Sequence, residues 1–167
     1  MSDIYISKRL VSSTINTISK LTLTNVQIDN LNVEYEGFTF ELENLTFKSR
    51  LAKKTPKKKG YLVAFWRKNE FNENVPFDDD TAEDKLIINI LDSDKIGQFI
   101  FPKNVLKEKG VIKSKKTKGK MAMRVYPSWV SNLNTTAKNT QRWQAKYFVD
   151  LSKEFDQEIL NPLYFDK

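Results

Sequence analysis

The chain has 167 residues, a formal net charge of +7 and neither cysteine nor histidine. A chain of this length can bury a substantial core, so we expect one domain over residues 1–167. The missing Cys and His exclude disulfides, ordinary structural zinc sites and the familiar Ser–His and Cys–His catalytic arrangements. The start does not resemble a secretory signal and no apolar run is long enough for a membrane span, so we expect a cytoplasmic protein without membrane contact.

Hydrophobic spacing predicts a mixed α+β order in the first part of the chain. Helical spacing gives way to alternation, and then to short runs that are apolar on both phases. The expected elements are a helix at 3–20, extended pieces at 21–35, a β-hairpin of 38–42 and 45–51, and strands at 61–66, 86–91 and 96–101. The run at 61–66, YLVAFW, is typical of a central strand covered on both faces.

The last third combines a basic loop with helices. Pro102 and Gly110 should bound a short helix, because proline suits a helix start and glycine a helix end. The loop at 113–120, KSKKTKGK, precedes a strand at 121–126. A second helix is expected from Thr135 onward. Its aromatic face would hold Trp143, Tyr147 and Leu151, beside a basic stripe of Lys138, Arg142 and Lys146.

Positive charge is concentrated in two segments. Residues 47–69 hold many Lys and Arg and no acid. Residues 103–124 also hold many Lys and Arg, and their single acid is Glu108. Nucleic-acid phosphates are bound largely by such charge, so we expect a non-catalytic nucleic-acid-binding protein of low sequence specificity, with DNA as the first choice. The alternative is that the lysines only keep a solvated surface soluble.

The candidate contacts come from the basic segments and from the aromatic and amide residues near them. Lys and Arg would bind phosphates, Trp would stack on bases and Gln would pair with base edges. The opposing interpretation is that Trp143 and Tyr147 form the buried face of a helix. The predicted site residues are Lys53, Lys54, Lys57, Lys58, Lys59, Arg67, Lys103, Arg124, Trp129, Gln141, Arg142 and Gln144, together with the loop at 113–120.

Five segments together resemble the MepB family of small bacterial proteins. They are AKKTPKKKGYLVAFWRK (52–68), PFDDD (76–80), GQFIFPK (97–103), RVYPSW (124–129) and TQRWQAKYF (140–148). The resemblance spans about residues 38–148. It implies a restriction-endonuclease-like fold, a mixed sheet flanked by helices, and a family in which one member lies beside a multidrug efflux pump and its repressor.

Active nucleases of that fold carry a metal-binding Asp on one strand and an acid, a spacer and a Lys on its neighbour. Here the run at 61–67 has no acid, Glu41 stands alone, and Asp92 with Asp94 and Lys95 lies at a connection. We therefore expect a degenerate metal site and assign no catalytic residue, metal ligand or cofactor.

Two other functions stay open. A magnesium-dependent nuclease would use carboxylates such as Asp78, Asp84, Asp92 or Asp94. Asp78 and Asp84 belong to the acidic run Asp78, Asp79, Asp80, Glu83 and Asp84, which also fits a solvated loop. A binding module for flat cationic drugs would combine aromatic rings with that loop. The oligomeric state is left open.

Overall fold

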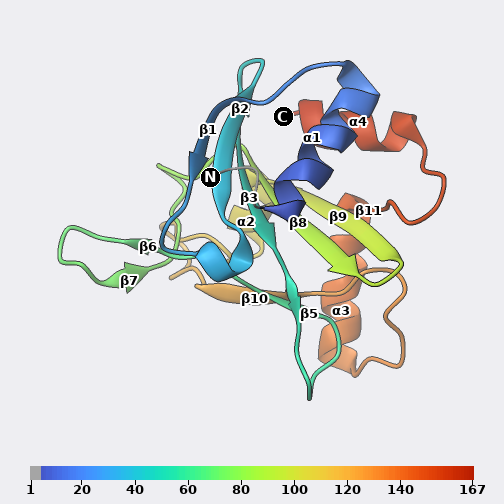
Figure 1. Ribbon diagram of the computed structural model, residues 1–167. Helices are drawn as coiled ribbons and strands as arrows, with labels where there is room; N and C mark the ends of the chain where they lie inside the picture. The colour runs from blue at the N-terminus through green and yellow to red at the C-terminus, as the bar shows by residue number, and fades with distance from the viewer. Residues whose placement is uncertain (1–4) are drawn as a thin grey trace.

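The computed structural model describes residues 5–167 and has a mixed α+β architecture built on a six-stranded sheet (Figure 1). Its strands are β1 (Thr24–Ile28), β2 (Phe38–Leu42), β3 (Leu45–Leu51), β8 (Lys85–Asp92), β9 (Lys95–Pro102) and β11 (Phe148–Asp150), in the order β1-β2-β3-β8-β9-β11. Neighbouring strands are antiparallel except for β3 and β8, which are parallel. The sheet is therefore mixed, as expected, and it contains the predicted hairpin β2-β3.

Two helices cover one face of this sheet, α1 (Ile6–Ser19) and α4 (Gln157–Phe165). They are the helices at the upper right of Figure 1. Val11 and Ile15 of α1 and Leu160 and Tyr164 of α4 are buried among the phenylalanines of β2 and β3. The predicted N-terminal helix is thus present, although the start expected at residues 3 and 4 lies outside the described residues.

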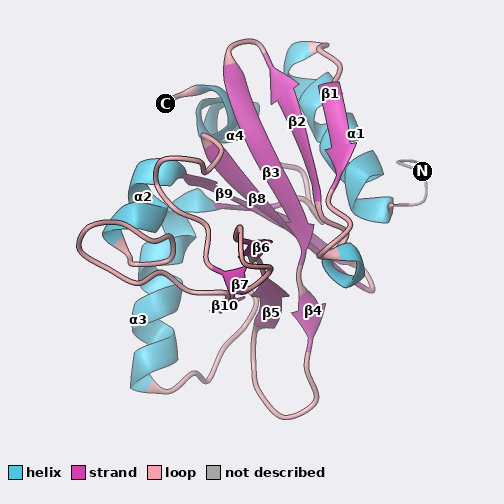
Figure 2. Ribbon diagram, turned by 90° about the vertical axis from the view of Figure 1, so that its left-hand side faces the viewer, coloured by secondary structure: helices cyan, strands magenta, loops and turns pink. Residues whose placement is uncertain are grey.

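The other face carries a smaller sheet in the order β10-β5-β4, formed by β10 (Ala122–Val125), β5 (Tyr61–Ala64) and β4 (Lys53–Lys54). The helices α2 (Lys103–Glu108) and α3 (Thr135–Gln144) lie beside it (Figure 2). The short helix at α2 and the strand at β10 agree with the predictions. A two-stranded ribbon, β6 (Arg67–Lys68) and β7 (Asn74–Val75), projects from this side of the molecule (Figure 1).

Strand β8 explains why some runs are apolar on both phases. Leu86 and Ile88 enter the core under the small sheet, whereas Ile87 enters the core under α1 and α4. The prediction that residues 61–66 form a strand covered on both faces was wrong. They contribute β5, the middle strand of the small sheet, which uses one face for the core and leaves Leu62 and Ala64 half-buried.

The C-terminal helix was predicted too long. Helix α3 ends at Gln144, and a 3-10 turn, η3 (Ala145–Tyr147), leads into β11. Because Phe148 pairs with Phe99 at the edge of the main sheet, sheet pairing overrides the helical spacing there. Leu151 therefore lies outside the helix whose face it was expected to share.

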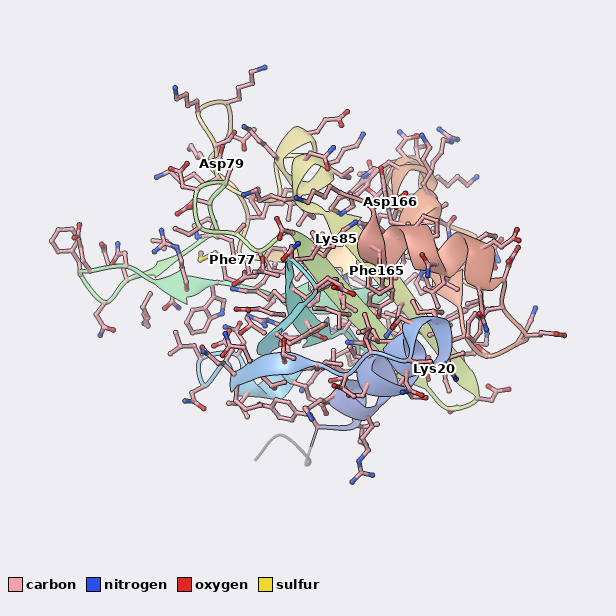
Figure 3. All side chains as sticks on the ribbon, turned by 90° about the horizontal axis from the view of Figure 1, so that it is seen from above. Lys20, Phe77, Asp79, Lys85, Phe165 and Asp166 are labelled. Carbon is pink, nitrogen blue, oxygen red and sulfur yellow. The ribbon has the colours of Figure 1, made fainter. Side chains whose placement is uncertain are left out.

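A buried lysine fastens the C-terminal helix to the sheet. The ammonium group of Lys85, at the start of β8, donates hydrogen bonds to the backbone carbonyls of Leu163, at 2.9 Å, and Asp166. Figure 3 shows Lys85 beside the end of α4. Cations suit this position because the last carbonyls of a helix have no partner inside it.

Within residues 5–167, no helix has the length and apolar character that a membrane crossing requires.

Candidate nucleic-acid interface

Arg124 of β10 holds the lysine-rich loop at 55–60 in place. Its guanidinium donates to the carbonyl of Lys59 at 3.0 Å and to the hydroxyl of Thr55 at 2.5 Å. The ammonium of Lys59 in turn donates to the carbonyls of Ser131 and Asn132, at 3.1 and 2.9 Å. The loop is therefore fixed between the small sheet and the segment that leads into α3.

Two hollows meet along β10 and form what we call the basic groove. One, of about 490 Å³, lies between the 57–59 triplet and the start of α3; the other, of about 220 Å³, lies between α2, β10 and α3. Arg124 and Tyr126 line both. The basic residues of the groove are Lys57, Lys58, Lys59, Lys109, Lys120 and Arg124.

The charge of this groove has one sign. None of the described residues that line the two hollows is Asp or Glu. All the lining lysines are exposed, and they come from two parts of the chain that are far apart in the sequence, residues 57–59 and residues 109–120. Figure 2 shows the two loops that supply most of them, one following β4 and one preceding β10. Such an acid-free concentration of cations attracts a polyanion and releases its condensed counterions.

Tyr126 is the aromatic residue that the two hollows share, and it was missed among the predicted contacts. It also lines a third hollow, of about 620 Å³, on the outer side of α3. Val125 is fully buried, whereas Arg124 and Tyr126 on either side of it are partly exposed. The alternation of a strand was the signal that could have identified Tyr126 as a partner of Arg124 on the outer face.

Gly60 allows Tyr126 to lie close to the loop. The φ angle of Gly60 is 78°, and a Cβ atom there would lie 2.6 Å from Cδ1 of Tyr126. Glycine adopts positive φ at little cost and has no side chain to collide with the ring. The end of the lysine-rich loop is thus adapted to one aromatic neighbour.

Trp129 and Lys54 border a separate hollow of about 540 Å³ on the other side of the triplet. Tyr61 donates to Asp92 at 2.6 Å and accepts from the Trp129 indole at 3.1 Å, while the Lys54 ammonium lies 3.6 Å from Asp92. Burial and the hydrogen bond to Asp92 raise the pKa of Tyr61 to about 12. Because Asp92 and Asp94 line this hollow, it is less favourable to phosphate than the basic groove.

Several predicted contacts do not line the groove. Lys53 lies 5.4 Å from the ring of Tyr35, and Arg67 pairs with Asp78 at 2.7 Å at the base of the ribbon. Lys103 is the first residue of α2 and lines none of the hollows described above. Of the loop at 113–120, only Lys120 lines the groove.

The two glutamines proposed to contact bases have backbone partners instead. Gln144 is fully buried; its amide donates to the Arg124 carbonyl at 3.0 Å and its oxygen accepts from the Tyr126 N–H at 3.0 Å. Gln141 donates to the carbonyls of Pro127 and Val130 at 3.0 and 2.9 Å. Both therefore position the segment that follows β10. Arg142 is exposed and lines the third hollow with Gln141.

Three of the carboxylates considered for magnesium, those of Asp78, Asp84 and Asp92, accept hydrogen bonds from other side chains. Asp78 accepts from Arg67 and Thr81, Asp84 accepts from Thr46, and Asp92 accepts from Tyr61. The hydrogen bonds from Thr81 and Arg67 lower the pKa of Asp78 despite its partial burial. Across residues 5–167, no three Asp and Glu side chains are grouped so that they could hold a metal ion.

Comparison with known proteins gives matches in sequence and in structure. The family model described as MepB-like matches residues 29–150, slightly beyond the 38–148 expected. The crystal structure of MepB is 41% identical, with a TM-score of 0.79 over 90% of this chain and 99% of that chain. A bacterial homing endonuclease, I-Ssp6803I, is a weak likeness, with a TM-score of 0.42 and 14% identity over 83% of this chain and 88% of that one. No curated protein matches the chain.

Proposed function

We propose that this chain, which belongs to the MepB-like family, is a nucleic-acid-binding protein that holds phosphates in the basic groove. The observation that carries the proposal is the convergence of cations from two distant parts of the chain on a groove whose described lining includes no acid. Lysines that serve solubility alone need no such convergence. We expect low sequence specificity, because the two glutamines that could contact bases have backbone partners.

We also propose a fold type, a cellular compartment and a ligand for this protein. The mixed sheet flanked by helices supports a restriction-endonuclease-like fold, and the absence of cysteine suits the cytoplasm. DNA is the first candidate ligand. A link to multidrug resistance would need binding of cationic drugs, which the positive groove disfavours at long range.

The test is a fluorescence-anisotropy titration of labelled DNA and RNA over a series of salt concentrations, with the products analysed on a gel. Binding should weaken steeply with salt, by about 0.9 in logarithmic slope for each duplex phosphate that the protein neutralises, because the counterions of that phosphate are released. The variant in which Lys57, Lys58 and Lys120 become Gln should lose affinity and have a shallower salt slope.

A matched control separates position from total charge. Substituting Lys115, Lys116 and Lys118 with Gln removes the same charge from exposed residues of the loop that do not line the groove. That control should keep most of the affinity. Equal losses in the two variants, or no binding at low salt, would reject the groove as the site. Cut strands in magnesium would show nuclease activity instead.

A further inference from the structure

The turn of the β6-β7 ribbon presents an aromatic side chain to solvent. Phe71 lies between the two strands and is 73% exposed, more than any other large hydrophobic residue within 5–167. Figure 1 shows the ribbon pointing away from the body of the molecule. Single exposed apolar residues are ordinary on a protein surface. What distinguishes Phe71 is how firmly its backbone is held.

Asn69 holds this turn in one shape. Its side-chain oxygen accepts hydrogen bonds from the N–H groups of Phe71 and Glu73, both at 2.9 Å. Its own N–H donates to the carbonyl of Glu73, and its carbonyl accepts from the N–H of Asn72, both at 3.0 Å. A preorganised turn loses little conformational entropy on binding. Phe71 therefore has the properties of an aromatic anchor for a partner.

The ribbon tip, residues 69–73, is anionic. It contains Glu70 and Glu73, both exposed, and no Lys or Arg. Lys68, which precedes it, donates to the carbonyl of Asn72 at 3.3 Å. Negative charge beside the exposed ring is unfavourable for contact with nucleic acid. It suits instead an apolar protein pocket that has a cationic rim.

The third hollow, on the outer side of α3, offers matching apolar surface. Tyr126, Ala145 and Phe148 line it. The ring of Phe148 packs against Phe99 and Trp129, at centroid distances of 4.6 and 5.5 Å, so this part of the lining is rigid. A volume of about 620 Å³ is within the range of pockets that enclose small ligands, so a phenyl ring can enter.

The rim of this hollow is positive. Lys138 and Arg142 lie one turn apart on α3, and both are exposed. The acid in the lining, Asp150, accepts hydrogen bonds from Ser152 at 2.9 and 2.6 Å. Two cations against one carboxylate give the rim the sign opposite to that of the ribbon tip. Complementary charge favours the encounter of two such surfaces and fixes their register.

The ribbon tip cannot reach the third hollow of its own chain. In Figure 1 the ribbon points away from the body on one side, whereas α3 lies on the other. We infer that Phe71 inserts into the third hollow of a second copy of this chain, and that the glutamates of the ribbon tip face the cations of the rim. The contact joins two different surfaces, so copies associate head to tail in rings or open chains. The inference concerns the free protein and does not rest on the proposed function.

The test is sedimentation velocity without nucleic acid, over protein concentrations from micromolar to millimolar. A tip of this size buries far less than the roughly 1,200 Å² of a stable interface, so association should be weak and the sedimentation coefficient should rise only at high concentration. Phe71→Ser should weaken association by about tenfold or more, the scale of an aromatic hot spot. Ile159→Ser, which removes an exposed hydrophobic side chain from α4, is the matched control and should behave like the wild type.

A second measurement tests the pairing of the two surfaces by reversing their charges. One variant carries Glu70→Lys and Glu73→Lys, and the other carries Lys138→Glu and Arg142→Glu. Each variant alone should stay monomeric, because like charges meet. An equimolar mixture should associate, because each reversed surface then has a complementary partner.

Three results would overturn the inference. They are a wild-type sedimentation coefficient that stays constant, association in Phe71→Ser equal to that of the wild type or of Ile159→Ser, and a mixture of the charge-reversed variants no larger than its components. Nucleic acid is absent from every sample, so these results leave the proposed function untouched.

Discussion

The guanidinium of Arg124 bridges the two ends of the lysine-rich loop, from the hydroxyl of Thr55 to the carbonyl of Lys59. The arrangement of the 57–59 triplet therefore depends on a side chain from another strand. Because Gln144 accepts from Tyr126 and donates to the carbonyl of Arg124, the support continues into α3. The groove is a set of cations placed by a hydrogen-bonded frame.

Arg124→Lys should loosen the loop although it keeps the charge. A lysine has no planar fork with which to reach both oxygens, and hydrogen bonds to charged groups contribute about 1.5–3 kcal/mol. Hydrogen exchange should become faster in the amides of residues 57–60, and nucleic-acid affinity should fall. Arg142→Lys, at an exposed arginine whose hydrogen bond is to Asn139, is the control and should leave exchange in the loop unchanged.

Gln144→Leu should destabilise the protein. It would leave the Tyr126 N–H and the Arg124 carbonyl without their partner, and each unsatisfied buried group costs about 1–3 kcal/mol. Urea denaturation should show a lower free energy of unfolding. A variant of normal stability that had lost nucleic-acid binding would instead identify Gln144 as a contact to the ligand.

Gly60→Ala should destabilise the protein more than Gly110→Ala. Both glycines have positive φ, 78° and 71°, so alanine is strained at each by about 1 kcal/mol. Only at Gly60 would the new Cβ lie 2.6 Å from the ring of Tyr126, whereas the nearest atom to it at Gly110 is 3.4 Å away. Unfolding of both variants in urea isolates this close approach. The Cβ would also lie 2.8 Å from the carbonyl oxygen of Val125, so equal losses would mean that both neighbours move aside at little cost.

Tyr61 should make stability depend on alkaline pH. The folded protein keeps the phenolic proton up to a pKa of about 12, whereas the unfolded chain releases it near the ordinary value of 10.0. The unfolded state therefore binds fewer protons between these pH values, so the free energy of unfolding should fall as the pH rises through them. The advantage of the wild type over Tyr61→Phe should be constant from pH 7 to 9 and then shrink. A constant advantage up to pH 11.5 would contradict this pKa.

Lys85→Met should detach the C-terminal helix. Methionine keeps much of the apolar stem but cannot donate to the carbonyls of Leu163 and Asp166. Protection of the α4 amides in hydrogen exchange should fall, with about 1–3 kcal/mol lost from the free energy of unfolding. Lys153→Met, at an exposed position outside the helices, should leave both values unchanged.

The sequence predicts most of the fold because its hydrophobic periods are clear. Alternation of apolar and polar residues predicts the hairpin β2-β3, and helical spacing predicts α1. Runs that are apolar at every position predict β8 and β9. The small sheet could not be predicted, because its middle strand β5 pairs with β10 from a distant part of the chain as well as with its neighbour β4. A strand whose residues are apolar at every position can pair in either sheet, so its sequence does not indicate which one it joins.

The structure brings only some of the predicted site residues together. The 57–59 triplet and Arg124 meet in one groove, but Arg67 and Lys103 do not reach it. The backbone partners of Gln141 and Gln144 could not be predicted, because the sequence does not distinguish a Gln that satisfies a backbone group from one that is free to contact a base. Only the path of the chain after β10 distinguishes the two roles.

The parallel pairing of β3 with β8 joins two hairpins that are separated by a long crossover in the sequence. Hairpins β2-β3 and β8-β9 close locally, whereas joining them closes the long crossover of residues 52–84, which carries β4 and β5. Strand β10 pairs with β5 across a longer stretch of sequence, and this pairing places Arg124 against the lysine-rich loop. A chain stalled earlier in folding would display the lysines without their frame, so we expect selective capture of a ligand to mark the fully folded protein.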